Sequence, residues 1–200
     1  LTRQFCSLAG GIIVPSRLTY DTLLEYGVKT PMKVIPTGIP IDYCDHLNNQ
    51  ALREDLGITD QDIVFISLSR LSKEKSIDQV IVAFKDIIKA LPQAKLVIVG
   101  GGPERENLEK LAQEIPDDRV KFVGEVDHEE VDKYYQLGDV YINASDSETQ
   151  GLTYIESLVN HVPVIAKKND YLETIFEGDS HFGCLYQEED ELVAVAVQYA

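Results

Sequence analysis

Five short apolar runs, each separated from the next by a helical pattern, constrain the fold of this chain more than any other feature. The runs are IVFISL (63–68), KLVIV (95–99), VKFV (120–123), DVYIN (139–143) and VPVIA (162–166). Short strands that are apolar throughout and alternate with amphipathic helices are typical of a parallel sheet covered on both faces. The sequence therefore predicts an α/β fold with a parallel sheet flanked by helices.

Local signals predict where several of the helices begin. Ser76 with Gln79, and Asp127 with Glu130, have the spacing of capping boxes. Pro103 is expected at the first position of the helix that follows 95–99. Functional residues are expected in the loops after the strands, because ligands of such sheets bind beyond the carboxyl ends of the strands.

The first 40 residues form a separate pattern of strand (11–15), helix (16–27) and strand (32–36). The stretch TGIPIDYCDHLN (37–48) then breaks the regularity, so we predict a boundary between a segment 1–40 and a domain 41–200. The chain starts without Met and without a clear signal-peptide pattern, and we interpret it as a piece of a longer protein.

Composition narrows the functional classes. The formal net charge is −16, which disfavours nonspecific binding to nucleic acid and to anionic membrane surfaces. The chain has an odd number of widely spaced cysteines (Cys6, Cys44 and Cys184), which fits a reducing cytoplasm and neither a disulfide framework nor a zinc site. The scattered histidines (His46, His128, His161 and His181) are interpreted as structural.

Two basic residues mark the loop after 63–68. Arg70 leaves the strand end, and Lys75 precedes the next helix, whose N-terminus adds free N–H groups and the positive end of a dipole. A guanidinium and an ammonium both bind phosphate oxygens, so Arg70 and Lys75 together predict a phosphate site. The alternative, solvated loop charges, is preferred for Lys73.

The loop after 95–99 reads GGGPER, and its glycines allow the backbone to approach a ligand or another loop closely. It is not a dinucleotide fingerprint, because Arg105 stands where that pattern requires its third glycine. A tight turn remains the alternative for Gly101 and Gly102.

The loop after 139–143 carries two glutamates, Glu148 and Glu156, eight positions apart. A helix is predicted to start near Gly151, which places Glu148 in the loop and Glu156 in the second helical turn. Glu156 suits the two hydroxyls of a ribose, Glu148 suits sugar hydroxyls, and the amides of Gly151 and Leu152 suit an anion. On spacing alone, a helix-dipole role for Glu148 and a solvated face for Glu156 remain open. A glycosidase carboxylate pair is disfavoured, because no apolar pocket is evident that would raise one pKa.

Four stretches together resemble retaining glycosyltransferases of family four: SLSRLSKEKSIDQVIVAF, KLVIVGGGPERENLEKLA, VKFVGEV and SETQGLTYIESLVNHVPVIA. The specific part is a Glu-x7-Glu motif with Gly-Leu and Pro-Val flanks. Such enzymes have the GT-B fold, in which two Rossmann-like domains face each other across a cleft. The resemblance implies that 1–40 is the end of the acceptor-side domain with the hinge, and that 41–200 is the Rossmann-like domain that binds the nucleotide sugar, truncated at its C-terminus.

The resemblance also implies roles for individual residues. Arg70 and Lys75 would hold the donor diphosphate and stabilise it as a leaving group, and Glu148 would contact the transferred sugar on its reacting face. Contacts to the rest of the donor would come from Glu156 at the ribose, the glycine loop, the helix start and the loop after KFVG at the base. These donor-binding residues are Glu156, Gly151, Leu152, Thr153, Gly101, Gly102, Val123 and Gly124.

The family is metal-independent, and fixed cations would do the electrostatic work of a metal. No cofactor is therefore expected besides the donor substrate. The chain departs from the family pattern at Ser69, Ser76 and His161, where glycine is common, and at KKNDYLE (167–173). SETQGLTYIE with AKKNDYLE is most similar to bacterial enzymes that glucosylate diacylglycerol at the cytoplasmic membrane face.

The resulting prediction is the donor-binding part of a retaining hexosyltransferase that moves glucose from a UDP-sugar to diacylglycerol or a related membrane lipid. The acceptor would be bound mainly by a missing domain, so this fragment is expected to be inactive alone, and the full enzyme to be cytoplasmic and peripheral at the inner membrane. One alternative is a sugar-nucleotide epimerase of GT-B fold. Another is a non-catalytic regulatory α/β domain, which is disfavoured because Arg70 stands where a phosphate-receiving aspartate is expected.

Overall fold

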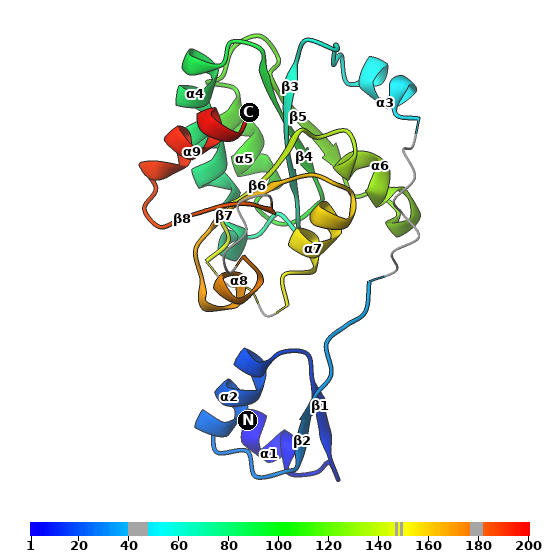
Figure 1. Cartoon of the computed structure of the whole chain (residues 1–200), viewed down its shortest axis with the longest axis vertical. Coiled ribbons are helices and arrows are strands. Elements are labelled where there is room, and N and C mark those ends of the chain that lie inside the picture. The colour runs from blue at the N-terminus through cyan, green and yellow to red at the C-terminus, as the bar shows by residue number, and fades with distance from the viewer. Residues whose placement is uncertain (40–47, 147, 149, 177–181) are drawn as a thin grey trace.

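The computed structural model describes residues 1–39, 48–146, 148, 150–176 and 182–200 (Figure 1). Its main feature is a six-stranded parallel sheet with the strand order β5-β4-β3-β6-β7-β8. The strands are β3 (Ile63–Leu68), β4 (Ala94–Val99), β5 (Val120–Gly124), β6 (Val140–Asn143), β7 (Val164–Lys167) and β8 (Gly183–Tyr186). The predicted α/β fold with a helix-flanked parallel sheet is confirmed.

Helices cover both faces of this sheet, because alternate residues of each strand enter opposite cores. Phe65 of β3 packs with one apolar cluster, and Val64 and Ile66 pack with the other. The first cluster contains buried residues of α4 (Ile77–Ala90), α5 (Arg105–Ala112) and α9 (Glu191–Tyr199). The second cluster contains residues of α3 (Gln50–Asp55), α6 (Val131–Tyr135), α7 (Leu152–Val159) and α8 (Asp170–Ile175).

The predicted capping boxes are wrong. Ser76 precedes α4 but has a left-handed φ of +47°, and its side chain makes no cap hydrogen bond. A capping side chain requires an extended backbone at that position, which Ser76 lacks because it follows the 3₁₀ turn η1 (Lys73–Lys75). Asp127 precedes a second 3₁₀ turn, η2 (His128–Glu130), and also makes no side-chain cap.

Pro103 does not open α5, which begins two residues later at Arg105. The backbone N–H of Glu104 donates instead to the carbonyl of Leu71 at 3.0 Å, so this turn is bonded to the loop after β3.

The N-terminal segment forms a small sheet of its own. β1 (Ile12–Val14) pairs in parallel with β2 (Met32–Val34), and α2 (Arg17–Glu25) connects them. An additional helix, α1 (Thr2–Cys6), was not among the predicted elements. The predicted boundary between residues 40 and 41 lies outside the described residues, as do Cys44, His46 and His181. No helix in the described part of the chain is long and apolar enough to cross a membrane.

The strand order reverses at β3, which pairs with β4 on one side and with β6 on the other. The connections that leave β3 and β6 therefore diverge from a common point at the carboxyl end of the sheet. Such a switch point is where open α/β sheets bind ligands. The two loops with predicted site residues, those after β3 and β6, flank this point.

Candidate functional site at the carboxyl end of the sheet

The loops after β3 and β6 are joined by an ion pair. Lys75 Nζ lies 2.8 Å from Glu148 Oε1, and only 8% of the Glu148 side chain is exposed. The adjacent polar residues also connect the two loops, since the hydroxyl of Ser76 lies 3.3 Å from Asp146 Oδ2. The structure thus places two predicted site residues, 73 positions apart in the chain, in direct contact.

Arg70 lies at the other end of the loop after β3. Its side chain is exposed, and it makes no hydrogen bond or salt bridge with any residue that the structure describes. The hydrogen bond from Ser72 lowers the pKa of Glu74, and the charges of Arg70 and Lys75 contribute to the same shift. The positive charges of this loop therefore favour the ionised form of the Glu74 carboxylate. The guanidinium of Arg70 remains accessible to a ligand.

The glycines after β4 support the loop that carries Arg70. A Cβ at Gly102 would overlap the backbone of Leu71, and a Cβ at Gly101 would lie 2.5 Å from the Glu125 carboxylate. The N–H of Leu71 donates to the Gly101 carbonyl at 2.8 Å. The sequence left open whether these glycines allow close approach to a ligand, allow close approach to another loop, or form a tight turn. The described contacts show close approach to another loop.

Val123 and Gly124 end β5 beside this glycine loop. The N–H of Gly100 donates to the Gly124 carbonyl at 2.7 Å. Gly124 has a φ of +98°, and a Cβ there would lie 3.0 Å from a guanidinium nitrogen of Arg105. Val123 is half-buried and packs with the second apolar cluster. Both residues therefore lie at the carboxyl edge of the sheet, one strand from the glycine loop and two strands from the Arg70 loop.

The start of α7 follows the prediction closely. Gly151 precedes the helix with a left-handed φ of +54°, and a Cβ there would lie 2.8 Å from the ring of Tyr154. Leu152 is the first helical residue, so its N–H belongs to the helix end that lacks intrahelical partners. Thr153 follows as the second residue of the helix.

Glu156 projects from the second turn of α7, as predicted. Its Oε2 accepts a hydrogen bond of 2.9 Å from the hydroxyl of Tyr135 on α6. The open alternative of a solvated helix face does not describe this residue, because the carboxylate is half-buried and bonded across helices.

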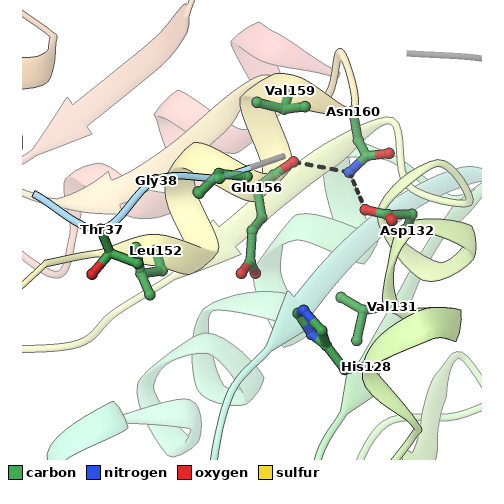
Figure 2. Close-up of a pocket in the computed structure, with 10 residues that line it drawn as sticks. Thr37, Gly38, His128, Val131, Asp132, Leu152, Glu156, Val159 and Asn160 are labelled. Carbon is green, nitrogen blue, oxygen red and sulfur yellow. Dashed lines mark hydrogen bonds between the residues drawn. The ribbon is translucent and has the colours of Figure 1, made fainter. Parts of the chain in front are cut away.

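A cavity of about 150 Å³ opens at Glu156. Figure 2 shows the side chains of Glu156 and His128 extending into it from α7 and from η2. Ten residues line the cavity: Thr37, Gly38, Ile39, His128, Val131, Asp132, Leu152, Glu156, Val159 and Asn160. This volume is below the roughly 300 Å³ typical of pockets that enclose a drug-sized ligand. The cavity therefore has room for only part of a ligand of that size.

The sequence did not predict four of the polar residues that line this cavity: Thr37, His128, Asp132 and Asn160. Asn160 Nδ2 donates to Asp132 Oδ1 at 2.8 Å and to the Glu156 carbonyl at 3.0 Å, as the dashed lines in Figure 2 show. His128, for which the sequence favours a structural role, lines the cavity. Its place four residues beyond β5, at the carboxyl edge, was a signal that could have identified it.

The linker from the N-terminal segment also reaches the site. Thr37 and Gly38 line the cavity, and the hydroxyl of Thr37 is hydrogen-bonded to the side-chain amide of Gln150 at 2.7 Å. In the described part of the chain, no group of three or more His, Cys, Asp or Glu side chains is arranged to hold a metal ion.

The model of the family described as "Glycosyl transferases group 1" matches residues 48–195. That range includes the six-stranded sheet and every predicted site residue.

Two curated relatives are similar over nearly the whole chain. The alpha-monoglucosyldiacylglycerol synthase of Streptococcus pneumoniae (strain ATCC BAA-255 / R6) is 41% identical over 99% of this chain and 46% of its own length. The protein of the same name from Acholeplasma laidlawii is 35% identical over 96% of this chain and 50% of its own length. The chain thus spans about half the length of the curated relatives that it matches.

Among solved structures, Anabaena Alr3699/HepE in complex with UDP and glucose superimposes with a TM-score of 0.84. The two sequences are 24% identical. The match covers 98% of this chain and 56% of the Anabaena protein. This similarity establishes the fold: the six-stranded domain matches one half of a GT-B structure.

Proposed function

The chain belongs to the group 1 glycosyl transferases, and we propose that it is the donor-binding part of an enzyme that transfers glucose from UDP-glucose to diacylglycerol or a related membrane lipid. The observation that carries this proposal is the contact of 2.8 Å between Lys75 and Glu148 across the switch point of the sheet. It supports the proposal because a single donor molecule would require a cation at its diphosphate and a carboxylate at its sugar, and Lys75 and Glu148 are a cation and a carboxylate in contact.

The electrostatics of the two loops support binding of the diphosphate. Arg70 is exposed and available for a forked contact with phosphate oxygens, and Lys75 adds a second positive charge. In a chain of net charge −16, these cations are concentrated on one loop at the carboxyl end of the sheet. A diphosphate would share Lys75 with Glu148, so the lysine would orient the carboxylate and the leaving group together.

The proposed reaction uses these contacts in a defined order. The bond between the anomeric carbon and the diphosphate oxygen breaks, and Arg70 and Lys75 stabilise the negative charge that develops on the departing diphosphate. The acceptor hydroxyl oxygen forms the new bond to the anomeric carbon on the same face, and its proton passes to the departing phosphate oxygen. Glu148 contacts the sugar on that face.

Glu156 and the cavity beside it are assigned to the nucleoside. The Glu156 carboxylate would accept hydrogen bonds from the ribose hydroxyls, and the amides of Gly151, Leu152 and Thr153 at the start of α7 would lie toward the phosphates and the sugar. Val123 and Gly124 would contact the base through their backbone, and Gly101 and Gly102 would face the donor beside the Arg70 loop. The size of the cavity, about 150 Å³, supports a site for one part of the donor.

The acceptor and the domain assignment rest on the relatives and on the N-terminal segment. Both curated relatives are named for a monoglucosylated diacylglycerol, which supports glucose and a lipid acceptor. We assign residues 1–40 to the acceptor-side domain and hinge, and 41–200 to the donor domain. Phe5, Leu8 and Ile13 are more than half exposed, as expected of side chains that pack against a larger domain.

Two further consequences complete the proposal. The acceptor would be bound mainly outside this chain, so the chain alone would bind donor and transfer nothing. The enzyme with both domains would act in the cytoplasm, peripherally at the inner membrane face, with membrane contact made by the acceptor-side domain.

Calorimetric titration of the chain with UDP, GDP and ADP tests the proposed donor. We expect the tightest binding for UDP, and no glucosyl transfer when UDP-glucose and diacylglycerol vesicles are added. A preference for GDP or ADP would refute the UDP assignment while leaving the family membership intact. Glucosyl transfer by the chain alone would refute the assignment of the acceptor site to another domain.

A further inference from the structure

Three tyrosines form a buried row beneath the two glutamates. Tyr135 on α6, Tyr141 on β6 and Tyr154 on α7 are fully buried. The ring centroids of Tyr135 and Tyr141 are 5.8 Å apart, and those of Tyr141 and Tyr154 are 5.7 Å apart with the rings at 89°. These distances are typical of favourable aromatic pairs, so each ring restricts the orientation of the next.

The two outer tyrosines each contact one of the glutamates. The hydroxyl of Tyr135 donates to Glu156 Oε2 at 2.9 Å, and the hydroxyl of Tyr154 donates to Glu148 Oε1 at 3.4 Å. Lys75 bonds to the same oxygen, Glu148 Oε1. In each carboxylate, therefore, only one oxygen is bonded to the protein: Oε2 of Glu156 and Oε1 of Glu148. The other oxygen of each carboxylate has no hydrogen bond to a residue that the structure describes.

The central tyrosine anchors the row to the sheet. The hydroxyl of Tyr141 donates to the Leu68 carbonyl at 3.1 Å and accepts from Asn143 Nδ2 at 3.0 Å. The side-chain oxygen of Asn143 in turn accepts from the N–H of Ser145 at 2.7 Å. The row is therefore fixed to the end of β3 and to the start of the loop that carries Glu148.

We propose that Tyr135 and Tyr154 are positioning residues, which direct the Glu156 and Glu148 carboxylates so that one oxygen of each is presented to the donor. The inference rests on the proposed donor site, because it assigns the free oxygens to the ribose and to the transferred sugar. Tyr141 holds the two phenols at the spacing that both contacts require.

The physical advantage is preorganisation. A glutamate side chain that moves freely must lose rotamer freedom when a ligand binds, and this loss weakens binding. A phenol held in a packed row fixes the carboxylate beforehand. Burial raises the pKa of Tyr135 and of Tyr154, so both hydroxyls keep their protons and remain donors to carboxylates at neutral pH.

Each tyrosine–glutamate contact is tested by removing one hydroxyl and comparing the affinities of two ligands that differ only in the group that the glutamate is proposed to bind. For Tyr135→Phe we expect the preference for UDP over 2′-deoxy-UDP to fall about fivefold, because Glu156 would be less well directed toward the ribose hydroxyls. For Tyr154→Phe we expect the preference for UDP-glucose over UDP to fall by a similar factor, about fivefold, because Glu148 contacts only the sugar. Each variant should leave the other ligand pair unchanged.

Tyr134→Phe is the matched control. Tyr134 adjoins Tyr135 on the same helix and is half-buried, and its hydroxyl has no hydrogen bond to a described residue. Its removal should change neither preference. A double mutant adds a second test. Because Tyr135 is proposed to act through Glu156, Tyr135→Phe should not change the preference for UDP over 2′-deoxy-UDP any further in a chain that already carries Glu156→Ala.

The outcomes separate the inference from the proposed function. If Tyr135→Phe weakens UDP and 2′-deoxy-UDP equally, or changes neither, the positioning role is wrong and the donor site stands. If the unmodified chain binds UDP no better than 2′-deoxy-UDP, the ribose role of Glu156 is wrong, and the role of Tyr135 falls with it. If it binds no nucleotide, the donor site and the positioning roles are both refuted.

Discussion

Lys75 and Glu148 form an ion pair of 2.8 Å between two loops that leave adjacent strands of the sheet, β3 and β6. The pair is only partly accessible, with 23% of the lysine side chain and 8% of the glutamate side chain exposed. A carboxylate that is so little exposed depends on its partners, since burial of an unpaired charge is costly. The same two residues are therefore expected to stabilise the folded site and to contact the donor.

Removal of the lysine should destabilise the chain. Lys75→Ala leaves Glu148 with the longer contact to Tyr154 alone, and we expect a loss of about 1–3 kcal/mol in the free energy of unfolding, the range for a buried polar group left unsatisfied. Urea denaturation at neutral pH measures it. The double variant Lys75→Ala/Glu148→Gln should recover part of the loss, because the buried group is then uncharged.

The control for this prediction is Lys73→Ala in the same 3₁₀ turn. The Lys73 side chain is exposed and makes no ion pair in the described part of the chain, so a change within about 0.5 kcal/mol is expected. Equal losses for Lys73→Ala and Lys75→Ala would show that the contact with Glu148 contributes nothing to stability.

Gly102 is predicted to be essential for the position of the Arg70 loop. A Cβ at Gly102 would overlap the backbone of Leu71, which cannot move without displacing Arg70. We expect Gly102→Ala to lower the free energy of unfolding by about 2–3 kcal/mol, the upper range for overpacking, and to weaken UDP binding. Gly10→Ala is the matched control, because nothing lies within 4 Å of a Cβ there. Unchanged stability in Gly102→Ala would contradict the close contact of the two loops.

Stability should decrease in alkaline solution, and buried tyrosines should cause part of the decrease. Burial raises the pKa of Tyr186 above the value of about 10 expected in the unfolded chain. The folded state then keeps a proton that the unfolded state loses, so stabilisation that is complete below pH 10 is lost as the pH rises further.

Comparison with Tyr186→Phe isolates this contribution. The Tyr186 hydroxyl is buried without a hydrogen-bond partner in the described structure, so its removal should be nearly neutral at pH 8. Between pH 10 and 11, the variant should lose about 1 kcal/mol less stability than the unmodified chain. Urea denaturation at pH 8, 10 and 11 measures the difference. Identical slopes in the two proteins would contradict the raised pKa.

The sheet was predictable because its strands are apolar throughout and end at clear breaks. β3 coincides with the predicted run 63–68, and β4 begins one residue before the predicted 95–99. Helix starts were less predictable. Ser76 is a good cap by residue type, yet the passage from a 3₁₀ turn into α4 requires a left-handed residue at this position. The sequence shows the residue type and not the backbone conformation that its neighbours impose.

Individual site residues were predictable, but their contacts were not. Lys75 and Glu148 could each be named from their loops, while their ion pair follows only from the adjacency of β3 and β6, which the order of the strands in the chain does not specify. His128 and Thr37 line one cavity although they lie about 90 positions apart. Tyr135 and Tyr154 occupy buried helical positions, where periodicity alone indicates core packing.

The most direct test of the account is calorimetric titration with UDP of the unmodified chain, of Arg70→Ala and of Lys73→Ala at one fixed salt concentration. Arg70 is proposed to contact the diphosphate and Lys73 is not, although both are exposed cations of the same loop. We predict that Arg70→Ala weakens UDP binding by about 1.5–3 kcal/mol, the range for a hydrogen bond to a charged group, and that Lys73→Ala weakens it less than about twofold. Equal affinities for all three proteins, or equal losses in the two variants, would contradict a donor-diphosphate site at the carboxyl end of β3.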